Sequence, residues 1–210
     1  MIAPDVVLTA AHCVAAIEQY GLDFLGVTFD PLFDPETSVV LSGTPHANPG
    51  FPGPASDTKD IAVIVLNEEV TGIEPAELPT ASLLDQLADK NGLRGQQFTA
   101  VGYGRTERTH EPASGAPVFG EPGIRMYSTS TFDALNKTFL RLSQNPSTGD
   151  GGACYGDSGG PNFLGAGSTE TNIIASITIT GDAVCRATNV TYRLDTPSAR
   201  AFLEDYVELP

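Results

Sequence analysis

Residues 154–161 read Cys-Tyr-Gly-Asp-Ser-Gly-Gly-Pro and set Ser158 among three glycines. Small neighbours let a substrate carbonyl approach the serine hydroxyl, and they let backbone N–H groups point at the same place. Ser158 is therefore a candidate nucleophile. A glycine-rich turn that merely contains serine and aspartate is the alternative, and the letters of this segment alone do not decide between the two.

The order of the histidines and acids relative to Ser158 limits the classes of serine hydrolase that the chain can match. All three histidines, His12, His46 and His110, precede Ser158. The nucleophile elbow of α/β-hydrolases has similar letters but needs its histidine after the serine, so it is excluded. A subtilisin-like order needs an acid before the histidine, and only Asp5 precedes His12. His46 and His110 lie in loops rich in turn-forming or polar residues and are expected at the surface, which leaves His12.

His12 and Asp60 are the candidate partners of the serine. His12 ends the apolar run 6–11, where two alanines leave room for an imidazole at a strand end. Asp60 heads the aliphatic run 61–66, and a carboxylate buried there needs a strong donor such as an imidazole Nδ1–H. The alternatives are a strand-end histidine and a turn aspartate without a catalytic role. The order histidine, aspartate, serine is that of chymotrypsin.

Composition and periodicity indicate an all-β chain. Hydrophobic residues make up 40% and charged residues 18% of the 210 residues, which is typical of a globular domain. Short apolar, β-branched runs alternate with turn residues. The expected strands are 39–41, 61–66, 98–103, 138–142, 173–180 and 190–194. A short helix or crossover is expected within 80–95, and a C-terminal helix is expected with Thr196 as its cap and Pro197 at its first position.

The charge excludes two classes of partner. The net charge is −15 and the isoelectric point is near 4.3. Nucleic acids and anionic lipids select Lys/Arg patches, so neither nucleic acid nor a membrane is expected as a partner. The apolar run 61–66 is far shorter than the roughly 20 residues that span a bilayer. The first five residues also lack the basic start of a signal peptide.

Three segments resemble, in order, the signatures of the trypsin/chymotrypsin-like serine proteases. They are Val-Leu-Thr-Ala-Ala-His-Cys at 7–13, Asp-Ile-Ala-Val at 60–63, and the 154–161 segment. Residues 100–104, Ala-Val-Gly-Tyr-Gly, also resemble that family's Gly-aromatic-Gly strand, so the resemblance covers nearly the whole chain. It implies a single peptidase domain over 1–210, with two antiparallel six-stranded β-barrels at 1–85 and 95–210 and a C-terminal helix.

The resemblance also implies an activity and a mechanism. The chain would be a serine endopeptidase in which His12 is the general base and acid, Asp60 orients it, and Ser158 forms an acyl-enzyme. The N–H groups of Gly156 and Ser158 would form the oxyanion hole. No metal or organic cofactor is implied. The expected partners are polypeptide substrates and protein inhibitors of a monomeric enzyme. A catalytically silent binding module and a hydrolase of small esters are the alternatives.

The same matching implies the substrate-binding residues. Gly152 stands where the family has the floor of its specificity pocket, and Gly181 stands at the entrance. A neutral floor gives a buried cation no counter-charge, so apolar side chains are expected there. Asp150, Asp182 and Asn189 are near enough in sequence to change that expectation.

The cysteines and the N-terminus show where this chain departs from the family. Cys154 and Cys185 match a family disulfide, which implies an extracellular location. Cys13 is left without a partner, because only eleven residues precede His12, where the family has a further strand and cysteine. The family's freed amino terminus, which forms an activation ion pair with the acid at Asp157, is missing too. We therefore expect an incomplete first barrel, and a longer secreted precursor of which this is a truncated reading.

Overall fold

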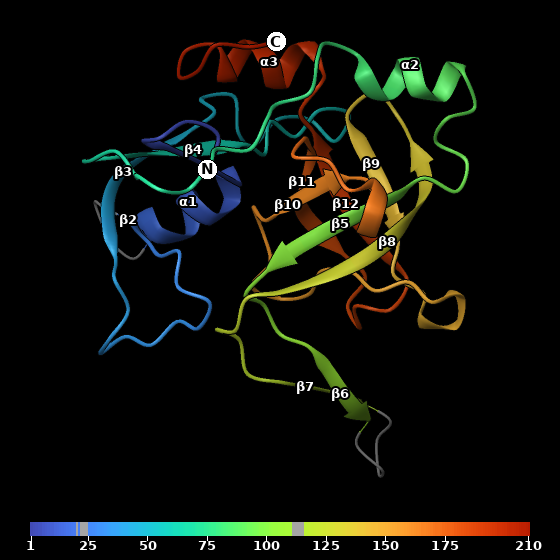
Figure 1. Cartoon of the computed structure of the whole chain (residues 1–210), viewed down its shortest axis with the longest axis horizontal. Coiled ribbons are helices and arrows are strands. Elements are labelled where there is room, and N and C mark those ends of the chain that lie inside the picture. The colour runs from blue at the N-terminus through green and yellow to red at the C-terminus, as the bar shows by residue number, and fades with distance from the viewer. Residues whose placement is uncertain (20, 22–24, 111–115) are drawn as a thin grey trace.

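The computed structural model of the chain describes residues 1–19, 21, 25–110 and 116–210 (Figure 1). Most of the regular structure is antiparallel strand, which confirms the all-β fold class. In this described part, the N-terminal half forms one open sheet of four strands. In spatial order they are β1 (Val6–Thr9), β4 (Ala62–Leu66), β3 (Leu41–Ala47) and β2 (Leu25–Val27). The open sheet agrees with the expected incomplete first barrel.

The C-terminal half forms a closed barrel whose described strands number six, as expected. In order around the barrel they are β10 (Pro161–Leu164), β11 (Ile174–Gly181), β12 (Thr188–Arg193), β9 (Phe139–Ser143), β8 (Met126–Leu135) and β5 (Gln97–Gly102). A separate hairpin, β6 (Glu107–His110) with β7 (Pro117–Phe119), projects away from the barrel (Figure 1). All strand runs expected from the sequence overlap observed strands, but β2, β8, β10 and this hairpin were not expected.

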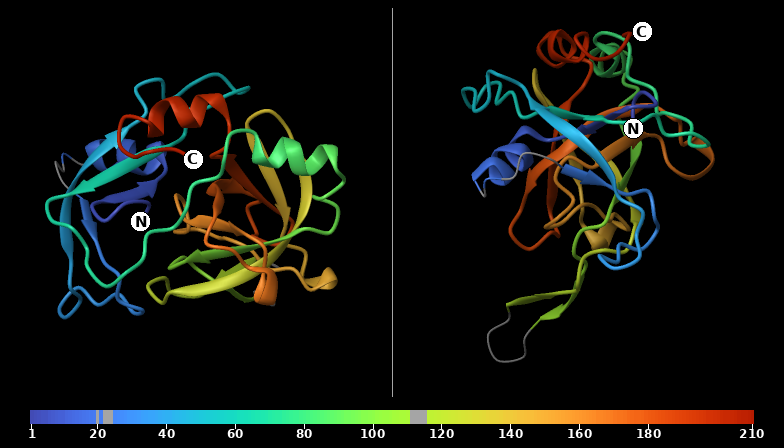
Figure 2. Two further views of the ribbon diagram at one scale, coloured as in Figure 1. Left: turned by 45° about the horizontal axis from the view of Figure 1, so that its top comes forward. Right: turned by 90° about the vertical axis from the view of Figure 1, so that its left-hand side faces the viewer.

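Helices cover one side of the molecule and one end of the first sheet. Figures 1 and 2 show α2 (Leu83–Asp89) and α3 (Pro197–Leu203) on the same side of the molecule, at the top of Figure 1, with the C-terminus beside α3. At the start of α3 the Thr196 hydroxyl accepts a hydrogen bond from the Ala199 N–H at 3.2 Å, which confirms the expected cap. The helix α1 (Ala11–Gln19) follows β1 directly and was not expected. Two short 3-10 helices span Pro146–Thr148 and Gly167–Thr169.

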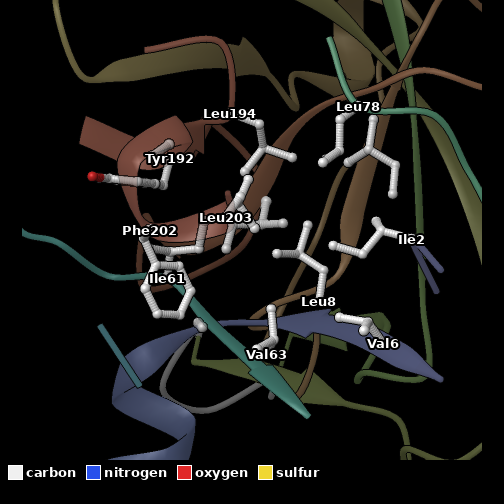
Figure 3. Close-up of a cluster of buried hydrophobic side chains, with 14 residues drawn as sticks. Ile2, Val6, Leu8, Ile61, Val63, Leu78, Tyr192, Leu194, Phe202 and Leu203 are labelled. Carbon is white, nitrogen blue, oxygen red and sulfur yellow. The ribbon is translucent and has the colours of Figure 1, made fainter. Parts of the chain in front are cut away.

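One apolar cluster joins the two halves of the molecule (Figure 3). Leu8 of β1 and Val63 of β4 come from the open sheet, while Tyr192 of β12 and Leu203 of α3 come from the C-terminal half. All four side chains are at least nine-tenths buried. Burying one such side chain stabilises the fold by about 1.5–3 kcal/mol. Because β1 and β4 are packed onto the barrel in this way, residues at their ends have a fixed position relative to the barrel's loops.

Candidate active site

His12 and Asp60 meet because the strands beside them are paired. Strands β1 and β4 run antiparallel with Thr9 opposite Ala62, so the residue shortly after β1 lies beside the residue shortly before β4. His12 Nδ1 is 2.8 Å from Asp60 Oδ2, and the His12 backbone N–H donates to Asp60 Oδ1 at 2.9 Å. Asp60 is 6% exposed, whereas the His12 side chain is 34% exposed. The carboxylate therefore holds an imidazole that solvent can reach.

The environment of His12 favours its protonated form. The hydrogen bond that His12 Nδ1–H donates to Asp60, followed by one with the Cys13 thiol, raises the pKa of His12 to about 10, although burial acts in the opposite direction. Because Nδ1 is engaged by Asp60, Nε2 is the ring nitrogen left to exchange a proton with another group. An imidazole oriented in this way is suited to act as a general base.

The loop of Ser158 packs against the end of β1, next to His12. Gly159 approaches this strand so closely that an added Cβ would lie 2.5 Å from Thr9 Oγ1, which is why only glycine fits there. The Cys13 thiol lies 3.8 Å from the Ser158 carbonyl oxygen. Within the described chain, Ser158 Oγ makes no hydrogen bond, to His12 or to any other residue. Catalytic hydrogen bonds of this kind are often long until a substrate is bound.

Two unused backbone donors lie beside Ser158. Neither the Gly156 N–H nor the Ser158 N–H donates a hydrogen bond to any residue that the structure describes. Between them, the Asp157 N–H is used by the Cys154 carbonyl at 3.0 Å. Gly156 has a φ of 97°, a left-handed conformation that favours glycine. Gly156 and Ser158 line the same cavity, of about 330 Å³, so both donors belong to residues at one site.

Asp157 is held by the backbone. Its Oδ1 accepts the Gly104 N–H at 2.7 Å, and its Oδ2 accepts the Cys154 N–H at 2.8 Å. Burial nevertheless raises the pKa of this carboxyl, because it outweighs the two hydrogen bonds. In the described residues no ammonium or guanidinium group forms an ion pair with it. A second cavity, of about 120 Å³, lies beside Asp157 and is also lined by Gly152.

The expected substrate-binding residues are divided between the two cavities. Gly181 lines the cavity of Ser158, but Gly152 lines only the cavity of Asp157, where the buried Gln144 side chain lies against it. Asp182 and Asn189 also line the Ser158 cavity. Asp150 is absent from that lining and accepts hydrogen bonds from Thr131 and Thr148 at 2.6 and 2.8 Å.

The disulfide implied by the resemblance is present. Cys154 and Cys185 are bonded, with Cα atoms 5.3 Å apart, and both line the Ser158 cavity. Cys13 is a free cysteine. His46 lies on β3 and not in a loop, with its ring 5.5 Å from that of Tyr206, and the side chain of His110 is outside the described residues.

Sequence reasoning missed Thr178, a residue shared by the two cavities. Thr178 lines both of them, and its carbonyl accepts the Gly159 N–H at 2.8 Å. With Ser176 and Thr180 it is one of the hydroxyl residues that alternate with apolar ones along β11, and this alternation is the signal that could have marked a polar face of the strand.

Comparison with known families agrees with this geometry. The Trypsin family model matches residues 1–202. The chain therefore belongs to the trypsin family, and a serine-protease-like function is supported by that membership. In the part of the chain that the structure describes, the longest helices are too short or too polar to cross a membrane.

Proposed function

We propose that this protein is a serine endopeptidase that hydrolyses peptide bonds through an acyl-enzyme. The observation that carries the proposal is the placement of His12. Its Nδ1 is 2.8 Å from the buried Asp60 carboxylate, and the thiol of the next residue, Cys13, is 3.8 Å from the Ser158 carbonyl oxygen, which places His12 beside the Ser158 loop. A histidine, an aspartate and a glycine-flanked serine in this order and arrangement suit acyl transfer.

In the proposed mechanism Ser158 Oγ attacks the scissile carbonyl carbon while its proton passes to His12 Nε2. The tetrahedral intermediate then collapses, the C–N bond breaks, and His12 gives the proton to the departing amine. Water, deprotonated by His12, attacks the acyl-enzyme, and the proton returns to Ser158. Asp60 stabilises the imidazolium that forms in each half of the reaction.

The free N–H groups of Gly156 and Ser158 are the proposed oxyanion hole. Both residues border the cavity that contains the nucleophile, and neither donor is used by another described residue. In comparable enzymes the loss of one such donor raises the activation barrier by roughly 2.7–4 kcal/mol.

The proposed location is extracellular. The proposed enzyme is a monomer that acts on polypeptides and can be bound by protein inhibitors. The Cys154–Cys185 disulfide supports this location, because disulfides persist in oxidising compartments. The net charge of −15 supports the expectation that nucleic acids and anionic membranes are not partners.

A catalytically silent, protease-like binding module is the second candidate. Two observations favour it: Ser158 Oγ lacks a hydrogen bond to His12 in the described structure, and Asp157 is stabilised by backbone N–H groups without an ammonium.

Labelling of the serine, combined with a peptide-cleavage assay, distinguishes the endopeptidase from the silent binding module. An endopeptidase reacts with a fluorophosphonate at Ser158 and cleaves an unstructured polypeptide, and Ser158→Ala abolishes both. The matched control is Ser168→Ala, because Ser168 is an exposed serine away from the cavity, and this variant should keep both activities. Folded protein that neither labels nor cleaves supports the silent module. Turnover of small esters without peptide cleavage identifies an ester hydrolase.

A further inference from the structure

The cavity beside Ser158 runs from the surface to a buried amide. At its outer end Tyr155 is 53% exposed, and at its inner end Asn189 is 1% exposed. The Cys154–Cys185 disulfide and Thr178 also contribute to the lining. A side chain that enters beside Ser158 therefore meets the polar end of Asn189 after it has left water.

The orientation of the Asn189 amide follows from its neighbours. The Ser176 carbonyl can only accept a hydrogen bond, so the Asn162 amide turns its Nδ2 toward it, at 3.5 Å. Asn162 Oδ1 then accepts from Asn189 Nδ2 at 3.2 Å. The same Nδ2 also donates to Thr178 Oγ1 at 3.2 Å.

Asn189 Oδ1 is consequently left as an unused acceptor. Both donors of the Asn189 amide face Asn162 and Thr178, and no residue in the described part of the chain donates to the oxygen. This oxygen is open to the cavity, because it is not among the fully buried unpaired side-chain atoms of the described residues, which are Thr58 Oγ1 and Gln144 Oε1. A side chain that filled the cavity without supplying a donor would cut the oxygen off from water and leave it unpaired, which is costly. Because Asn189 lines the cavity, such a donor can reach the oxygen from inside it.

Asp182 adds a negative charge to the same cavity. Burial acts to raise its pKa, but backbone N–H bonds from Thr188, Arg186 and Ala187 outweigh this effect and hold the pKa at about 2. Asp182 is therefore an anion at neutral pH. An anionic side chain that entered the cavity would be repelled, whereas a hydrogen-bond donor would not.

We propose that this cavity selects a substrate side chain that ends in an N–H or O–H donor, and that Asn189 Oδ1 accepts its hydrogen bond. The inference rests on the proposed peptidase function and names the residue just before the scissile bond. Glutamine, asparagine and the basic residues meet the requirement. Apolar residues, which a glycine floor at Gly152 would have favoured, leave Asn189 Oδ1 unpaired. Acidic residues are repelled by the Asp182 carboxylate.

Peptides that differ only in this one residue test the proposal. Glutamine and methionine have nearly the same length, as do asparagine and leucine, but only the amides carry donors. We expect kcat/KM to be about tenfold higher for the amide of each pair, the size of effect that one satisfied buried acceptor gives. Glutamine should also exceed glutamate by at least as much. Equal rates within each pair, or a preference for the apolar member, overturn the proposal.

Variants at Asn189 test the residue assignment. Asn189→Leu removes the acceptor at nearly constant size and should abolish the preference for glutamine over methionine. Because this change also leaves Asn162 and Thr178 short of a partner, Asn189→Asp is the second variant, and it should move the preference toward lysine. Asn172→Leu is the matched control, since Asn172 is exposed and donates to the Pro75 carbonyl instead. An unchanged preference in folded Asn189→Asp contradicts the assignment.

Fluorophosphonate labelling distinguishes a failure of the role given to Asn189 from a failure of the proposed peptidase function. Labelled Ser158 with peptide cleavage but no donor preference contradicts only the role of Asn189. Folded protein with no labelling and no cleavage of any peptide overturns both.

Discussion

Asp60 and Asp157 are two carboxylates of the candidate active site that are stabilised in different ways. Asp60 receives a backbone N–H and the imidazole of His12, whereas Asp157 receives two backbone N–H groups, from Gly104 and Cys154. The first carboxylate is paired with a group that gains and loses a proton. The second is paired with groups that cannot. Under the proposed mechanism, Asp60 would act on the chemistry through His12, while Asp157 would set the shape of the Ser158 loop.

The largest expected effect comes from Asp60→Asn. The amide can accept only one of the two His12 donors, so it holds the imidazole in the wrong tautomer or releases it. We expect kcat to fall by about 10⁴-fold with little loss of folded protein, as for triads of this kind. The measurement is steady-state peptide hydrolysis beside a thermal unfolding curve. A loss below tenfold in folded protein is incompatible with the role given to Asp60.

Asp157→Asn should instead reduce stability. One of the two N–H groups from Gly104 and Cys154 loses its acceptor, and the amide adds a donor with no partner. We expect the free energy of unfolding to fall by about 1–3 kcal/mol, measured by denaturant titration. Activity per folded molecule should fall far less than in Asp60→Asn. If the two variants lose the same activity, the contrast between these carboxylates is wrong.

The pH dependence of kcat/KM also distinguishes the two carboxylates. His12 must be neutral to take the Ser158 proton, so kcat/KM should fall as pH falls through its pKa. The Asp60 hydrogen bond raises that pKa, which places the acid limb of the profile above 6.5. Asp60→Asn should move this limb down in pH, and Asp157→Asn should leave it in place. A limb that moves with Asp157 and not with Asp60 would reverse the assignment.

The smallest effect is expected at a site in contact with neither carboxylate. Thr196→Ala removes the hydroxyl that accepts the Ala199 N–H at the start of α3. The free energy of unfolding should fall by about 1 kcal/mol, and kcat should be unchanged. A change in kcat would mean that α3 influences the site through the shared apolar cluster.

Much of the fold could be predicted from the sequence, because apolar β-branched runs mark buried strands. Strand β8 was not predicted, because it is rich in hydroxyl residues. Ser128 and Ser130 point these groups at the carbonyls of Gly152 and Gly151, at 2.9 and 2.6 Å, so the strand packs through hydrogen bonds and lacks an apolar pattern. Helix α1 was missed since it is short and much of its buried face is alanine.

The candidate site was only partly predictable, for a related reason. His12, Asp60 and Ser158 could be selected because their residue types and their order are visible in the chain. The lining of the cavity could not, because it depends on the register of paired strands and on where long side chains fold. Gln144 lies over Gly152, and Asn189 enters the Ser158 cavity through the pairing of β11 with β12.

The rate at which a fluorophosphonate labels Ser158, compared between the unmodified protein and His12→Ala, tests the central claim most directly. This rate reports activation of the hydroxyl without any requirement for a particular peptide. The account predicts one label per folded chain at Ser158, and a rate lower by at least about 10³-fold in His12→Ala. Equal rates in the two proteins would contradict it, as would a label that maps to a different serine.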